Sequence, residues 1–128
     1  MLKVYIADDS VVVRGKLKEA LEEQGSIQVV GESGDALQAI LEIRKLDPQV
    51  VIIDIRMPGG GGLPVLKDIK ARTPSRIAII LTSFPFPQHR ETYLAAGADY
   101  FFDKTKDMLQ MTDKLVELAA KNVGSHAG

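Results

Sequence analysis

Three short runs of the sequence are continuously apolar and rich in β-branched residues, at positions 4–7, 50–53 and 77–80. Strands that are apolar on both faces are typical of a sheet that helices cover on both sides. Two further runs, at positions 27–31 and 99–102, also have the composition of strands. We therefore expect five strands, at residues 2–7, 27–31, 50–53, 76–81 and 99–102.

Longer segments with helical periodicity separate these runs. Ser10 and Asp35 are suited to cap the first two helices, which are expected to end near Gly25 and before Asp47-Pro48. Strands that alternate with helices predict an α/β fold with a parallel sheet and right-handed crossovers. The remaining helices are expected at residues 64–73 and 88–96 and from Thr105 onward.

The composition is that of an ordinary folded domain, with 45% hydrophobic and 26% charged residues among 128. Cysteine is absent, which excludes a disulfide framework and a thiolate metal site. A net charge of −1 argues against bulk electrostatic attachment to nucleic acid or anionic lipid. No apolar run approaches the roughly 20 residues of a membrane span, and the first residues do not form a signal peptide. We therefore expect a cytoplasmic protein.

The domain is expected to comprise residues 1–123, followed by a flexible tail at residues 124–128. No linker or internal repeat divides the chain. No helix-turn-helix or catalytic segment follows the last expected helix, so we expect a single domain without an output domain in this chain.

Polar side chains follow four of the expected strands. Asp8-Asp9, Asp54, Thr82 and Lys104 each come at the carboxyl end of a strand. Ligand sites in parallel α/β sheets form at that edge. Each residue taken alone has an ordinary structural explanation, but together they place three carboxylates, a hydroxyl and an ammonium group on one rim.

Clustered carboxylates repel one another, and a hard divalent cation such as Mg²⁺ relieves that repulsion. A carboxylate can then act as a nucleophile and form an acyl phosphate. Asp54 follows a buried apolar strand and is the expected acceptor. Lys104 supplies a compact positive charge and Thr82 a hydroxyl donor for the transferred oxygens.

Four segments together resemble the receiver domain of bacterial two-component response regulators. The resemblance extends over essentially the whole chain and implies a flavodoxin-like three-layer sandwich with a five-stranded parallel sheet in the order 2-1-3-4-5. The segments are residues 4–10 (VYIADDS), 51–58 (VIIDIRMP), 79–83 (IILTS) and 97–104 (GADYFFDK).

The resemblance also implies roles for the residues around the acceptor. It makes Asp54 the phosphoacceptor and Asp8 and Asp9 the acidic pair, with Asp9 a direct Mg²⁺ ligand and Asp8 acting largely through water. The backbone carbonyl of Arg56 matches the third protein ligand of the metal.

Thr82 and Lys104 match the pair that contacts the phosphoryl group, and Phe101 matches the aromatic switch position. Phe101 stands where tyrosine is common, so any switch there depends on burial alone. Thr105 stands where the family commonly has proline, so the sequence leaves the geometry of the Lys104–Thr105 peptide open.

The implied function is a phosphoacceptor switch rather than an enzyme with a separate substrate. Its donor would be a histidine kinase or a phosphotransfer protein, and its output an unknown downstream protein, without direct nucleic-acid or membrane binding. A pseudo-receiver without phosphoryl chemistry is the main alternative. A dehalogenase-type phosphatase is disfavoured because Ser10, not aspartate, lies two residues after Asp8. A flavodoxin is disfavoured because residues 11–13 are all valine.

The loop after Thr82 has the sequence Phe84-Pro85-Phe86-Pro87, which is stiff and apolar. The Arg56 guanidinium is expected to stack on the Phe84 ring across the site entrance. By the resemblance, fast-hydrolysing receivers often carry polar side chains at these two positions. A long-lived acyl phosphate is therefore expected.

Overall fold

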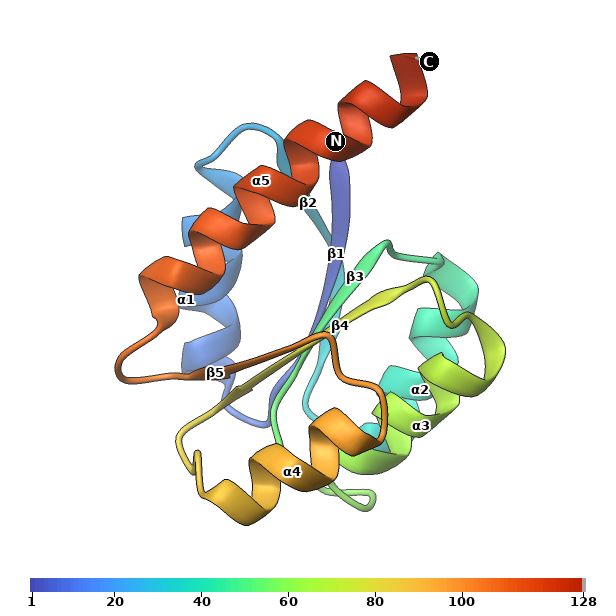
Figure 1. Cartoon of the computed structure of the whole chain (residues 1–128), viewed down its shortest axis with the longest axis vertical. Helices are drawn as coiled ribbons and strands as arrows, with labels where there is room; N and C mark the ends of the chain where they lie inside the picture. Colours follow the sequence, from blue (N-terminus) through green and yellow to red (C-terminus); the bar gives the residue numbers. More distant parts are fainter. Residues whose placement is uncertain (128) are drawn as a thin grey trace.

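The computed structural model describes residues 1–127, with side chains as far as Lys121. The protein is a three-layer sandwich (Figure 1). Five parallel strands form one sheet in the order β2-β1-β3-β4-β5, which confirms the expected fold class and strand order. The strands are β1 (Leu2–Ala7), β2 (Ile27–Ser33), β3 (Val50–Ile53), β4 (Ile77–Thr82) and β5 (Tyr100–Asp103).

Helices cover both faces of the sheet. Two of them, α1 and α5, lie on one face, and α2, α3 and α4 lie on the other (Figure 1). The helices are α1 (Val11–Glu22), α2 (Ala36–Leu46), α3 (Gly62–Arg72), α4 (Pro87–Ala95) and α5 (Met108–Ala127).

The two faces of the sheet carry separate hydrophobic cores, which explains the continuously apolar strands. In β3, Val51 and Ile53 pack in the core under α2 and α3, whereas Val50 and Ile52 pack in the core under α1 and α5. Successive side chains of a strand point to opposite faces, so a strand covered on both sides must be apolar at every position.

The expected helix caps are present. The Ser10 side chain accepts a hydrogen bond from the Val13 amide at 3.2 Å at the start of α1. Asp35 Oδ1 accepts from the amides of Leu37 and Gln38 at 2.9 and 3.0 Å at the start of α2. The helix α2 ends before Asp47-Pro48, as expected, and Asp47 adopts a left-handed backbone conformation with φ at 52°. These polar contacts define where α1 and α2 begin, directly beside the carboxyl ends of β1 and β2.

The last helix begins at Met108 and not at Thr105, so the sequence prediction was wrong by nearly one turn. The Asp103 carboxylate accepts hydrogen bonds from both the amide and the hydroxyl of Thr105, at 2.8 and 2.7 Å. The Asp103 amide in turn donates to the side chain of Asp107 at 2.9 Å. These contacts close residues 103–107 into a turn that delays the helix.

Smaller boundary differences occur elsewhere. β2 runs to Ser33, two residues beyond its expected end, while β4 and β5 begin and end one residue later than expected. α5 continues to Ala127, past Val123, where the domain was expected to end. Flexibility of residues 124–128 stays a prediction, and Gly128 lies outside the described residues.

All described peptide bonds are trans, including the Lys104–Thr105 bond that the sequence left open. Within the described part of the chain, no helix combines the length and apolar character needed to cross a bilayer. The parallel strands bring their carboxyl ends to one edge of the sheet, and the candidate site lies there.

Candidate functional site

Asp54 is the first residue after β3 and lies in the middle of the sheet edge. Its amide donates a hydrogen bond to the Ala7 carbonyl at 2.9 Å, which ties the end of β3 to the end of β1. The residue is only 6% exposed. A carboxylate that is so buried must be compensated by a cation or by hydrogen bonds.

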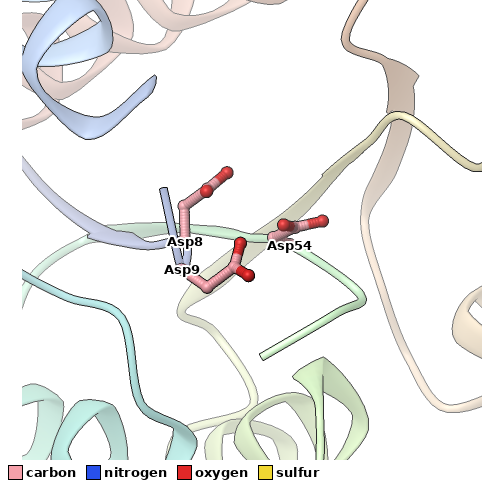
Figure 2. Close-up of side chains that lie close together, drawn as sticks. All are labelled: Asp8, Asp9 and Asp54. Carbon is pink, nitrogen blue, oxygen red and sulfur yellow. The ribbon is translucent and has the colours of Figure 1, made fainter. Parts of the chain in front are cut away.

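Two further carboxylates lie beside Asp54 (Figure 2). One oxygen from each of Asp8, Asp9 and Asp54 lies within 4.8 Å of the others. Asp8 and Asp54 are buried, whereas Asp9 is exposed. Three converging carboxylate oxygens are a donor set that suits Mg²⁺, which prefers oxygen ligands and retains water.

Lys104 bridges the two buried carboxylates. Its Nζ lies 2.6 Å from Asp8 Oδ2 and 3.2 Å from Asp54 Oδ2. The backbone of Lys104 is also fixed, because its amide donates to the Thr82 carbonyl at 2.9 Å. The contacts therefore join the ends of β1, β3, β4 and β5, as the sequence predicted for these four strand ends.

Burial and charge shift the pKa values of this cluster. Burial and the neighbouring Asp8 carboxylate raise the pKa of Asp54, and Lys104 together with a backbone hydrogen bond from Arg56 opposes that shift. Burial alone would lower the pKa of Lys104, but the contacts with Asp8 and Asp54 outweigh it and raise that pKa. Folding thus opposes ionisation of Asp54, and an added cation would relieve that cost.

Thr82 and Phe101 lie on the neighbouring strands β4 and β5 and face the same side of the sheet. Thr82 pairs with Asp103 and Ile80 pairs with Phe101, so Phe101 lies two residues back along β5 from the partner of Thr82. Thr82 is fully buried and Phe101 is nearly so. The Thr82 Oγ1 accepts a hydrogen bond from the Phe84 amide at 2.9 Å, which leaves its own proton available for donation.

Arg56 stacks on Phe84, as the sequence predicted. The guanidinium carbon lies 3.6 Å from the centre of the Phe84 ring. The Phe84 backbone is held on both sides, because its amide donates to Thr82 and its carbonyl lies 2.9 Å from His89 Nδ1. A role for the Arg56 carbonyl as a metal ligand stays a prediction.

The sequence interpretation missed Arg14. This residue lies on the inward stripe of α1 with Leu17 and Leu21, and its side chain contacts Asp8 and Glu32. A charged residue on the buried stripe of a helix requires polar partners, and that pattern was the available signal.

Comparisons with known proteins agree with this fold. Residues 4–116 match the response regulator receiver domain family. The DNA-binding transcriptional activator DevR/DosR of Mycobacterium tuberculosis is 32% identical over 125 residues, which cover 98% of this chain and 55% of that protein. A protein-glutamate methylesterase/protein-glutamine glutaminase of Alkalilimnicola ehrlichii is 34% identical over 123 residues, covering 91% of this chain and 31% of that protein.

A solved structure shows the same fold. The response regulator domain of Thermotoga maritima CheB matches with a TM-score of 0.82 and 27% identity, covering 94% of this chain and 95% of that domain. The chain therefore belongs to the receiver domain family of two-component response regulators. It spans about a third to just over half of the length of the two relatives compared by sequence.

The raised pKa of Asp54 predicts how stability depends on pH. Because the folded domain binds the Asp54 proton more tightly than the unfolded chain, the free energy of unfolding falls as pH rises from the ordinary value of 3.8 through the folded pKa. Asp54→Asn removes this penalty, so its stability advantage over the unmodified protein should grow as pH rises above about 4 and level off above the folded pKa of Asp54. Urea unfolding without divalent cations measures this. A difference that stays constant or shrinks with rising pH would contradict it.

Proposed function

We propose that this domain is a phosphoacceptor switch that is phosphorylated on Asp54 with Mg²⁺ and signals to a protein partner by changing shape. The observation that carries the proposal is the buried Asp54 carboxylate with oxygens of Asp8 and Asp9 within 4.8 Å and Lys104 at 3.2 Å. Phosphoryl transfer depends mainly on positioning and on neutralising charge, and these residues supply both.

The metal would be bound by Asp9 and Asp54 directly, by Asp8 largely through water, and by the backbone carbonyl of Arg56. When bound, Mg²⁺ would neutralise the carboxylates and the oxygens of the transferred group. Membership of the receiver family and the oxygen donor set both support this assignment.

The transfer step needs only groups that the site provides. One Asp54 oxygen attacks the phosphorus of a phosphohistidine or of acetyl phosphate, and a P–O bond forms as the bond to the donor nitrogen or oxygen breaks. The leaving group departs with the electron pair of that broken bond. Lys104 offers its ammonium group to the transferred oxygens, and Thr82 offers its hydroxyl proton.

The switch would begin at Thr82. If its hydroxyl moves toward the phosphoryl oxygens, its hydrogen bond with the Phe84 amide must change, because both involve Oγ1. The Lys104 amide is bound to the Thr82 carbonyl, so β4 and β5 would move together. Phe101 lies on the same face and in contact with Arg90, whose guanidinium carbon is 5.8 Å from the ring centre.

The output surface would be formed by α4, β5 and α5. Phe86 is 53% exposed in the loop before α4, and its ring lies 5.6 Å from that of His89. A protein that binds this surface would respond to movement of the loop. The donor would be a histidine kinase or phosphotransfer protein. The location would be cytoplasmic. No separate substrate and no direct nucleic-acid contact is proposed for this chain.

The acceptor assignment predicts one modification. Incubation with acetyl phosphate and Mg²⁺ should add a single phosphoryl group that hydroxylamine removes, because an acyl phosphate is cleaved by that nucleophile. Intact-protein mass spectrometry measures the addition. Asp54→Asn should abolish it, and Asp9→Ala should reduce it. Labelling that survives Asp54→Asn would move the acceptor elsewhere, and no labelling of the unmodified protein would favour a pseudo-receiver.

The Arg56–Phe84 stack predicts a slow loss of the phosphoryl group. Neither side chain can act as a general base for water, and we infer that the stack also limits access of water to the site. Replacing both, as Arg56→Asn with Phe84→Glu, should speed the decay of the acyl phosphate by about a hundredfold, the lower end of what a general base contributes. Decay is followed by mass spectrometry after removal of acetyl phosphate.

The matched control is Arg56→Lys with Phe84→Leu, which breaks the stack but supplies no carboxylate. Its decay rate should lie between those of the unmodified protein and of the Asn and Glu variant, since it removes shielding alone. An unchanged or slower rate in the Asn and Glu variant would overturn the assignment of a long lifetime to this stack.

A further inference from the structure

We propose that Arg14 is a positioning residue of the metal site, which fixes the Asp8–Asp9 peptide so that the Asp9 carboxylate remains where the cation binds. The inference deepens the proposed function and rests on it, because the metal site is part of that proposal. The residue is outside the site that the sequence indicated, and it contacts neither Asp54 nor Lys104 in the described structure.

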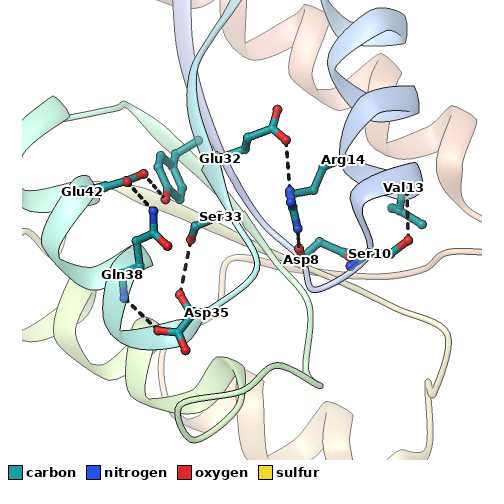
Figure 3. A network of polar contacts seen from close by, with 10 residues as sticks. Asp8, Ser10, Val13, Arg14, Glu32, Ser33, Asp35, Gln38 and Glu42 are labelled. Atoms are coloured by element: carbon teal, nitrogen blue, oxygen red, sulfur yellow. Dashed lines mark hydrogen bonds and ion pairs between the residues drawn. The ribbon is translucent and has the colours of Figure 1, made fainter.

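The side chain of Arg14 lies between the end of β1 and the end of β2 (Figure 3). Its Nη1 donates to the backbone carbonyl of Asp8 at 2.6 Å. Its Nε donates to Glu32 Oε1 at 3.0 Å. The side chain is 14% exposed, so water competes little with these two bonds. Arg14, on α1, therefore links Glu32 of β2 to the Asp8–Asp9 peptide group through its guanidinium.

That peptide group determines where Asp9 points. Asp8 is anchored at every polar atom: its amide donates to the Ser33 carbonyl at 3.0 Å, Oδ1 accepts from the Ser10 amide at 2.9 Å, and Oδ2 contacts Lys104. The Asp9 carboxylate is exposed and has no hydrogen bond or ion pair with the described residues. Its place therefore depends on the backbone that Arg14 fixes.

The turn after β2 packs closely on the Arg14 guanidinium at Gly34. A methyl group on Gly34 would lie 2.8 Å from Arg14 Nη1, 3.3 Å from Asp9 Cα and 3.4 Å from the Asp8 carbonyl oxygen. The backbone of Gly34 is not in the left-handed region, so alanine is conformationally allowed there. Gly34→Ala should consequently displace the guanidinium or the Asp8–Asp9 backbone without straining its own residue.

Charge and position predict effects of opposite sign at Arg14. A positive charge beside a cation site weakens metal binding, so removal of Arg14 would tighten binding of Mg²⁺ if charge alone mattered. Loss of the hydrogen bond from Arg14 to the Asp8 carbonyl frees the Asp9 backbone and should weaken the binding of Mg²⁺. Glu32 pairs with Arg14 and reduces the repulsive effect of its charge, so we expect the positional effect to be the larger one.

The test compares Mg²⁺ affinities of phosphate-free protein from backbone amide chemical shifts. Arg14→Met keeps the apolar stem of the side chain but removes both hydrogen bonds, and it should weaken Mg²⁺ binding by about tenfold, as is usual when a partner of a metal ligand is lost. Gly34→Ala should weaken binding in the same direction. Unchanged or tighter binding in Arg14→Met would overturn the proposal.

Matched variants separate the positional effect of Arg14 on Mg²⁺ affinity from an effect of lost folding or lost charge. Lys18→Met removes the same charge one turn further along α1, at an exposed position, and should leave the affinity unchanged. Urea unfolding checks that each variant is folded; if Arg14→Met is not, Gly34→Ala decides the outcome. Asp9→Ala should abolish most of the binding. Failure of the unmodified protein to bind Mg²⁺ would refute the metal site itself, whereas normal binding with no effect at Arg14 and Gly34 would refute only this inference.

Discussion

The contacts of Lys104 with Asp8 and Asp54 join parts of the chain that are far apart in sequence. They bring the ends of β1, β3 and β5 to one point, and the hydrogen bond from the Lys104 amide to Thr82 adds β4. One ammonium group faces two buried carboxylates, and Asp9 adds a third acidic group beside them. The cluster is therefore short of positive charge, which suits a site that binds a cation.

The same arrangement supports the proposed switch. Thr82 is buried, its side chain is bonded to the Phe84 amide, and its carbonyl is bonded to Lys104. A small displacement of Thr82 must therefore change the loop before α4 and the end of β5 together. Pro85 and Pro87 restrict how the loop backbone can absorb such a change. A phosphoryl group on Asp54 could shift the equilibrium between the two positions of Thr82 only by interacting more favourably with the displaced one.

Much of the fold and of the site could be predicted from the sequence. The apolar strands indicated a doubly covered sheet, and the polar residues at their carboxyl ends marked Asp8, Asp54 and Lys104, which lie together in the structure. The Arg56–Phe84 stack was predicted from two positions that the resemblance to receiver domains singled out. The start of α5 was missed because Asp103 and Asp107 close a turn through side-chain bonds that helical periodicity does not register.

Arg14 was missed for a related reason, since its partners are the Asp8 backbone carbonyl and Glu32 on another strand. In the proposed function, a phosphoryl group on Asp54 is sensed through Thr82 as far as Phe101. Amide chemical shifts measured on adding beryllofluoride, a phosphoryl mimic, with Mg²⁺ test it most directly. We expect changes at Phe84, Phe86 and Phe101, blunted in Thr82→Ala. Changes confined to Asp8, Asp9 and Asp54 would contradict transmission by this route.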